Sequence, residues 1–472
     1  MSETHIWWIR RDLRLQDNPA LTEAIKGADQ LIPLFILEPQ LMENAAPFRR
    51  AFLINALIDL DRQLQALGSR LIVRSGPAFQ ALTQLTGETG SAKIFVTRDY
   101  SPFARQRDNE IQQAMGLFST SGITLREPDS VLKEDGTPYR IYTPYKNKWL
   151  QEPLPTPADC LPKPDSLPPL PEYLFSEELS IEDSVPGFIA ATGEAHRRLE
   201  AFTKIGLVHY QSNRDRLDLD GTSCLSPYLR FGLLSARECF AYAHIRLLQT
   251  SEANTRDEIQ TWINELIWRE FFTMILSYHP QVLDGPFREE LAAIPWREVP
   301  ADLHAWQQGQ TGFPIVDACM RQMLNTGWMH NRGRMIVASF LTKDLLVNWQ
   351  EGEAWFMAHL VDGDPAANNG GWQWTAGTGT DAAPWFRIFN PILQGREFDP
   401  DGIYIGRWVP ELAKLPPKFR HEPWKLNAVE ANDLNFKLGR DYPERIVDRS
   451  ISRERTLTAY QFARDQAGSN RT

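Results

Sequence analysis

A short run between Asp362 and Trp374, with the sequence DGDPAANNGGWQW, concentrates acids, amides, glycines and tryptophans. Such residues pack poorly in an apolar core, but they suit the binding of a polar, flat, aromatic ligand. Twelve of the chain's 15 tryptophans lie between Trp262 and Trp424, so aromatic rings are concentrated around this run. The sequence therefore predicts an aromatic-ligand site here, with a tryptophan-rich helical core as the alternative explanation.

A second candidate group lies in residues 257–278, where apolar periodicity predicts a helix. Trp262, Glu265 and Arg269 recur at three- and four-residue spacing and share one face, with Trp268 beside them. A carboxylate among indoles is either desolvated or directed at a ligand. An ordinary ion pair between Glu265 and Arg269 explains the same spacing.

Residues 221–226, GTSCLS, offer three hydroxyls and turn amides before a helix-like segment. This pattern is typical of a phosphate site and also of a simple helix N-cap. The chain has no G-x-S-x-G or H-E-x-x-H motif and no metal-spaced cluster of histidines and cysteines. We therefore expect neither hydrolytic nor metal chemistry, and four widely spaced cysteines predict reduced thiols.

Length and charge limit the class of protein. A chain of 472 residues with 42% apolar residues predicts a globular protein of two or three units. The formal charge is −10, but residues 151–200 hold 10 acidic and 3 basic residues, whereas residues 321–343 hold Arg321, Arg332, Arg334, Lys343 and no acid. The latter stretch predicts a local positive surface that permits a polyanionic partner. We expect a cytoplasmic protein without membrane association, because no apolar run resembles a signal peptide or a membrane span.

The elements that must position these residues fall into three parts. Short apolar strands at 5–9, 31–37, 70–74 and 93–97 alternate with amphipathic helices such as 51–67, which predicts a doubly wound parallel α/β sheet in residues 1–130. Residues 131–194 are predicted to be a linker, because eight prolines fall within 151–171. Residues 195–472 show helical periodicity and predict an all-α domain.

Five ordered motifs resemble the DNA photolyase and cryptochrome family. They lie at residues 8–14, 221–226, 262–271, 327–335 and 362–391, so the resemblance covers nearly the whole chain. It is greatest to class I photolyases that act on cyclobutane pyrimidine dimers. The resemblance implies an N-terminal α/β antenna-type domain and a C-terminal helical domain that binds FAD and DNA.

The resemblance also implies roles for particular residues, transferred position by position. Asn368 would lie opposite flavin N5, and Arg334 would pair with Asp362. Trp372, Trp349 and Trp296 match an electron-transfer chain from the flavin to the surface. The full set expected to hold FAD is Tyr210, Thr222, Ser223, Leu225, Ser226, Trp262, Arg269, Arg334, Asp362, Asp364 and Asn368.

The residues expected to bind DNA and the lesion are Arg214, Glu265, Trp268, Asn331, Arg332, Met335 and Trp374. Members that act on the (6-4) lesion carry a histidine pair where this chain has only His330. The expected function is light-driven repair of pyrimidine dimers in DNA by a monomer: excited, reduced FAD passes an electron to a flipped-out dimer, and Glu265 stabilises the radical anion. The alternatives are a cryptochrome-type light receptor without repair activity and a tryptophan-rich binding module without flavin.

The antenna chromophore is the least determined cofactor. Folate-binding members carry an Asn-Glu pair where this chain has Phe103 and Ala104. Residues 99–108 look closer to members that use a deazaflavin, although Ser101 stands where those commonly have glutamate. A deazaflavin is favoured over folate, with another flavin or an empty pocket left open.

Overall fold

The computed structural model describes residues 3–90 and 93–469. Two compact units account for the chain: Met1–Gln211 with Thr222–Pro280, here called unit 1, and Ser212–Gly221 with Gln281–Thr472, here called unit 2. This division follows packing, whereas the boundaries expected from sequence follow changes of local pattern. The helices from Thr192 to Tyr278 pack with the α/β part, and the short segment Ser212–Gly221 packs with the C-terminal helices.

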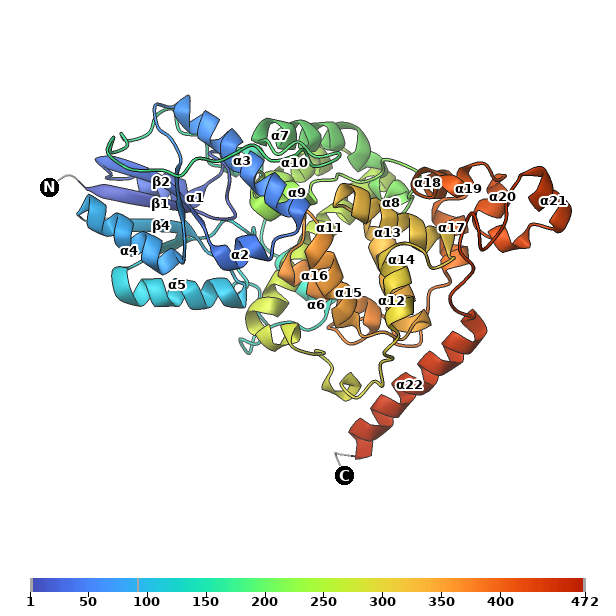
Figure 1. Ribbon diagram of the computed structural model, residues 1–472. Coiled ribbons are helices and arrows are strands. Elements are labelled where there is room, and N and C mark those ends of the chain that lie inside the picture. The colour runs from blue at the N-terminus through green and yellow to red at the C-terminus, as the bar shows by residue number, and fades with distance from the viewer. Residues whose placement is uncertain (1–2, 91–92, 470–472) are drawn as a thin grey trace. The chain divides into compact units, whose positions relative to one another are not determined.

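Unit 1 contains the predicted parallel sheet. Its strands are β1 (Thr4–Ile9), β2 (Gln30–Leu37), β3 (Ile72–Ser75), β4 (Lys93–Thr97) and β5 (Phe118–Thr120), in the order β3-β2-β1-β4-β5 (Figure 1). All four strand pairings are parallel, which confirms the expected doubly wound sheet. The sequence did not indicate β5, because this strand is three residues long and largely exposed.

Helices cover the sheet and extend unit 1. They are α1 (Pro19–Ile25), α2 (Pro39–Glu43), α3 (Pro47–Gln65), α4 (Ala78–Thr89), α5 (Pro102–Met115), α6 (Tyr142–Trp149), α7 (Thr192–Ala201), α9 (Ser226–Phe231), α10 (Ala236–Gln249) and α11 (Ala253–Tyr278). The short helix α8 (Tyr210–Asn213) begins in unit 1 and ends in unit 2. Leu82 and Leu85 of α4 and Ile111 of α5 pack on strand residues in one apolar core. Helix α6 lies inside the predicted linker; the proline-rich residues 151–171 that follow it form only one short 3-10 turn.

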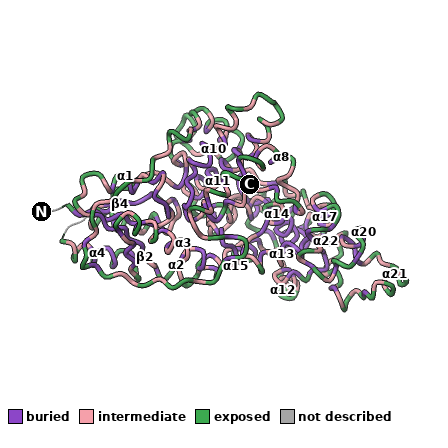
Figure 2. The backbone as a smooth tube through the Cα atoms, turned by 90° about the horizontal axis from the view of Figure 1, so that it is seen from above, coloured by how far each residue is buried: buried purple, intermediate pink, exposed green. Residues whose placement is uncertain are grey.

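Unit 2 is helical, as expected. Its helices are α12 (Pro300–Gln307), α13 (Pro314–Thr326), α14 (Asn331–Ser339), α15 (Trp349–His359), α16 (Pro365–Ala376), α17 (Pro391–Phe398), α18 (Ile403–Trp408), α19 (Pro410–Ala413), α20 (Pro417–Arg420), α21 (Ala428–Asp433) and α22 (Arg449–Ser469). A π-helical turn, Phe340–Asp344, continues α14. Buried backbone runs through α13 and α14 (Figure 2), whose apolar faces form the core with α15 and α16.

Candidate functional site

In unit 2, an ion pair joins the start of α14 to the loop before α16. Arg334 donates to both carboxylate oxygens of Asp362, at 3.0 and 2.8 Å, and its Nε donates to the carbonyl of Met329. The Asp362 side chain is only 3% exposed. The expected pairing of these two residues is therefore present, and it fixes the loop that leads into α16.

Helix α16 begins at Asp364, whose side chain caps it by accepting hydrogen bonds from the backbone N–H groups of Ala366 and Ala367. One turn later, the Asn368 side-chain nitrogen donates to the carbonyl of Glu353, 3.0 Å away on α15. The amide nitrogen is thus engaged with α15. The Asn368 side-chain oxygen remains available as a hydrogen-bond acceptor.

Glu353 is a polar residue of this region that the sequence did not single out. Its carboxylate accepts a hydrogen bond from Asn369, at 3.1 Å. Burial raises the pKa of Glu353 to about 7, and the bond from Asn369 opposes that shift only in part. A carboxyl with such a pKa, on the same residue whose carbonyl accepts the hydrogen bond from Asn368, is a functional candidate. Its signal in the sequence, an acid within an apolar helix, is too common to stand out.

Two members of the expected tryptophan chain, Trp349 and Trp372, lie on the packed helices α15 and α16. Trp372 is 2% exposed, and a side chain on Gly352 would collide with its ring. Trp349 lies three residues before Gly352 and therefore shares the face of α15 that approaches Trp372. Trp296 lies half-buried, with its ring edge-on to Tyr460 at 6.1 Å between centroids.

Five residues expected to meet the lesion or its flanks leave exposed surface. Asn331 is exposed and Met335 half-buried, four residues apart on α14. Trp374 on α16 and Glu265 and Trp268 on α11 are also half-buried. Each of these three helices also buries several apolar side chains in a core.

In unit 1, two residues expected to bind FAD belong to one aromatic cluster. The ring of Phe202 lies 5.2 Å from Trp262 and 5.9 Å from Tyr210, measured between centroids. Leu225 is 1% exposed and precedes α9, whereas Thr222 and Ser223 are half-buried and Ser226 is exposed. Cys224, between these hydroxyls, has a positive φ of 50°, a left-handed conformation that is uncommon outside glycine.

Trp268 on α11 lies under a ring that the sequence placed in the linker. Tyr142 of α6 stacks on Trp268 with centroids 3.6 Å apart and planes within 8°, and its hydroxyl donates to the carbonyl of Asn264. Tyr142 thus covers one face of Trp268, a residue that is expected to contact the lesion. Arg269 donates to the carbonyl of Ile123 at 2.9 Å, so it also ties α11 to the loop after β5.

Glu270 is a second residue missed at the sequence level. It is 1% exposed, and its carboxylate accepts hydrogen bonds from the indole of Trp149 at 2.7 Å and from the backbone N–H groups of Leu125 and Arg126. Burial raises its pKa, although these donors oppose the shift. Its partners lie more than a hundred residues away, so no local pattern could reveal them.

The expected positive surface at residues 321–343 is wrong. Arg321 pairs with Glu411 at 2.7 Å, and Arg332 pairs with Asp215 at 2.7 Å. The ammonium of Lys343 is buried and donates to the carbonyls of Ala376 and Trp385. Acids distant in sequence, together with burial, remove most of the charge that the local count suggested.

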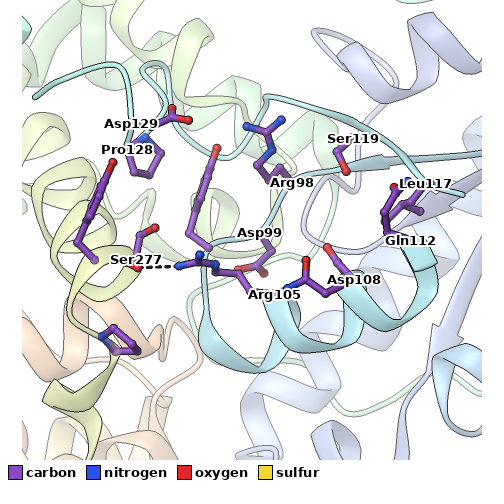
Figure 3. Close-up of a pocket in the computed structure, with 14 residues that line it drawn as sticks. Arg98, Asp99, Arg105, Asp108, Gln112, Leu117, Ser119, Pro128, Asp129 and Ser277 are labelled. Atoms are coloured by element: carbon purple, nitrogen blue, oxygen red, sulfur yellow. Dashed lines mark hydrogen bonds between the residues drawn. The ribbon is translucent and has the colours of Figure 1, made fainter. Parts of the chain in front are cut away.

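A cleft of about 680 Å³ opens in unit 1 beside the carboxyl end of β4 (Figure 3). Arg98, Asp99 and α5 residues such as Asp108 line it, and Arg105 donates to the carbonyl of Ser277 across it. Burial raises the pKa of Asp99, but Arg11 and Arg10 outweigh that effect and lower it to about 2. A cleft at the carboxyl ends of parallel strands is a typical ligand site of doubly wound folds.

Within residues 3–90 and 93–469, no cluster of three or more metal-ligating side chains occurs, and all four cysteines are free thiols. Over the same part of the chain, no helix combines the length and the apolar character needed to cross a lipid bilayer.

Comparison with known proteins identifies the family. Residues 5–164 match the DNA photolyase family, and residues 262–462 match the FAD binding domain of DNA photolyase. The chain is 40% identical to the deoxyribodipyrimidine photo-lyase of Escherichia coli, over 98% of this chain and 99% of that protein.

Solved structures show the same fold. A bacterial class III photolyase from Agrobacterium tumefaciens superposes with a TM-score of 0.92 at 36% identity, over 98% of both chains. A cryptochrome from Synechocystis superposes with a TM-score of 0.87 at 28% identity, over 97% of this chain and 99% of that one. With its FAD-binding domain and its identity to a photo-lyase along the full chain, this protein belongs to the DNA photolyase family and is an enzyme of the deoxyribodipyrimidine photo-lyase type.

Proposed function

We propose that this enzyme repairs cyclobutane pyrimidine dimers in DNA under light, using reduced FAD. The observation that carries the proposal is the set Glu265, Trp268, Asn331, Met335 and Trp374, whose side chains are all left partly or fully exposed on helices that bury many of their apolar side chains. A dimer is poorly stacked, so flipping it out of the duplex costs less than flipping a normal base. Trp268 and Trp374 offer flat apolar surfaces on which a flipped dimer can rest.

When bound and reduced, FAD would supply the electron that opens the dimer after light absorption. The residues proposed to hold it occur in both units, and the geometry of each part is consistent with this role. In unit 2, the Arg334–Asp362 pair and the capping by Asp364 fix a polar edge at the start of α16. In unit 1, the turn at Cys224 presents the hydroxyls of Thr222 and Ser223, which suits phosphate oxygens.

Asn368 has a defined part in this proposal. Because its amide nitrogen already donates to Glu353, the side-chain oxygen is the group that can face the flavin. That oxygen would accept a hydrogen bond from a protonated N5 and has no proton to give. This arrangement favours the reduced flavin that repair requires.

Glu265 is proposed to touch the lesion itself. Its place one turn after Trp262 and three residues before Trp268 puts a carboxyl beside indoles on α11. A protonated carboxyl there can donate a hydrogen bond to a pyrimidine carbonyl, where negative charge develops as the dimer accepts the electron. Arg214 and Arg332 are proposed to bind the phosphates that flank the lesion. The enzyme is proposed to act on DNA as a monomer.

A repair assay on two substrates tests the proposal. Duplexes that carry a single cyclobutane dimer or a single (6-4) product are incubated with the fully reduced enzyme in blue light and in the dark. We expect restoration of the cyclobutane dimer in light only, and no change in the (6-4) product. Equal activity on both lesions, or no activity on either, would contradict the assignment.

The second candidate function is light sensing without repair. The similarity to a Synechocystis cryptochrome favours keeping it, because the shared fold does not separate the two activities. The same assay decides between them. A sensor would form the flavin-dependent absorption spectrum and respond to light, yet leave both lesions unrepaired.

We also propose that unit 1 binds a second, light-harvesting chromophore, a deazaflavin more readily than a folate. The cleft beside β4 supports a site of this kind, because it adjoins the segment 99–108 and combines charged groups with the ring of Tyr278. An absorption and mass analysis of the extracted chromophores identifies the molecule. Full stoichiometric FAD with no second chromophore, even after reconstitution with each candidate, would refute this part.

A further inference from the structure

The guanidinium of Arg332 is held by an acid from a separate segment of unit 2. Its Nε and one Nη donate to the two carboxylate oxygens of Asp215, at 3.2 and 2.7 Å, and its Cζ lies 4.4 Å from the centroid of the Phe398 ring. Asp215 belongs to the segment Ser212–Gly221, and Arg332 lies 117 residues further along the chain. The pair presents the fork geometry that arginine also uses for a phosphate.

We propose that Asp215 competes with DNA phosphate for Arg332 and thereby weakens the hold of the enzyme on DNA. This inference rests on the proposed role of Arg332 as a phosphate contact. In the DNA-free protein, the Asp215 carboxylate binds the Arg332 guanidinium in the way that a phosphate would. A DNA phosphate can reach Arg332 only when Asp215 releases it, so most undamaged DNA bound by the wild-type protein lacks this phosphate contact.

The exposure of the pair makes this exchange possible. Arg334, two residues further on, is 26% exposed itself, but it pairs with a carboxylate whose side chain is only 3% exposed, so that acid is closed to solvent. The Asp215 side chain is 32% exposed and that of Arg332 is 15% exposed. A released Asp215 can therefore be solvated, whereas a released Asp362 would be left buried without its partner.

The segment that carries Asp215 is anchored by other contacts. Leu217 is 5% exposed in the apolar core and donates its backbone N–H to the carbonyl of Phe398. Arg216 forms a two-point ion pair with Asp218. Because these contacts do not involve Asp215, replacing its carboxylate with an amide should leave the segment in place.

The competition matters most for DNA without a lesion. Once a dimer is repaired, the contacts to the flipped bases are lost and binding depends chiefly on phosphates. An internal carboxylate that recaptures Arg332 then speeds release of the product. Asp215 would thus favour turnover at the cost of affinity.

The test compares Asp215→Asn with wild type in binding to a labelled duplex across a salt series in the dark. We expect the variant to bind undamaged duplex roughly threefold to tenfold more tightly at low salt, and the slope of log K against log salt to steepen by about 0.9, the value for one additional phosphate contact. Single-turnover repair should be unchanged, whereas multiple turnover should slow.

Two further variants complete the experiment. Glu411→Gln is the matched control, because Glu411 pairs with Arg321 at 2.7 Å with similar exposure of 26% and 20%. It should change neither affinity nor slope. In an Arg332→Gln background, Asp215→Asn should lose its effect on the slope.

The outcomes separate the inference from the proposed function. Weaker binding by Asp215→Asn, or an unchanged slope, would show that Asp215 only positions Arg332 and would overturn the competition. Failure of wild type to prefer lesion-bearing over undamaged duplex would instead contradict the proposed function. The salt slopes of the two proteins would still report on Asp215 in that case.

Discussion

The side chain of Asn368 donates a hydrogen bond to the backbone carbonyl of Glu353 at 3.0 Å, and the next residue, Asn369, donates to the Glu353 carboxylate. One residue of α15 therefore receives both amides at the start of α16. The contact fixes which atom of Asn368 remains as an acceptor. It also buries a carboxyl whose pKa is raised to about 7.

Replacing Glu353 with glutamine should alter the pH dependence of stability. Unfolded, the carboxyl titrates near 4.5, and burial raises the folded pKa to about 7. Folding thus favours the protonated carboxyl. The contribution of Glu353 to the stability of the folded state is therefore fully present below about pH 4.5 and is lost as the pH rises through 7. We expect the free energy of unfolding of Glu353→Gln, relative to that of wild type, to rise by roughly 1–3 kcal/mol from pH 5 to pH 8.5. Urea unfolding at both pH values measures this gain, with the exposed Glu351→Gln as control. A difference between variant and wild type that does not change with pH would contradict the prediction.

Gly352→Ala tests the close approach of α15 to the tryptophan chain. A methyl group at Gly352 would overlap the ring of Trp372, so one of the two helices must shift. We expect a loss of about 1–3 kcal/mol in the free energy of unfolding and slower photoreduction of FAD. Gly87→Ala on α4 is the control, since no atom lies within 4 Å of the added group. That control should be neutral or stabilising by up to about 1 kcal/mol. Similar effects of both variants would argue against contact between Gly352 and Trp372.

Glu265→Ala should lower the quantum yield of repair more than it lowers FAD content or affinity for lesion-bearing DNA. The expected loss is about tenfold in yield, at the lower end of the effect of one hydrogen bond to a charged group, about 1.5–3 kcal/mol. Repair of a single dimer with fully reduced enzyme measures the yield, and the flavin absorbance measures FAD content. Loss of folding or of flavin without a separate effect on yield would support a purely structural ion pair with Arg269.

Trp296→Phe separates photoreduction from repair. Phenylalanine keeps most of the packing volume beside Tyr460 but lacks an easily oxidised ring. If Trp296 is the terminal donor, light should no longer reduce oxidised FAD in the presence of an external reductant. Chemically reduced enzyme should still repair dimers at about the wild-type rate. Normal photoreduction would refute the electron-transfer role, and loss of both activities would indicate a structural one.

The local pattern of the sequence determined several secondary-structure elements and the family motifs of this protein. Apolar runs at 5–9, 31–37 and 93–97 predicted three of the strands to within one residue, and the periodicity of 257–278 predicted α11. These features depend on neighbours in the sequence, because strand and helix formation follow the spacing of apolar side chains. The motifs around Glu265 and Asn368 likewise indicated the family, because they consist of residues that are adjacent in the chain.

Only the tertiary structure decided how the charges and buried acids are used. Residues 321–343 contain no acid, yet Asp215 and Glu411 neutralise two of their arginines. Tyr142 falls in the segment that the prolines of residues 151–171 predicted to be a linker, yet its ring stacks on Trp268. Glu353 acquires its raised pKa by burial. Ion pairs, ring stacking and desolvation depend on distance in space, and partners such as Arg321 and Glu411, 90 residues apart, leave no periodic signal in the sequence.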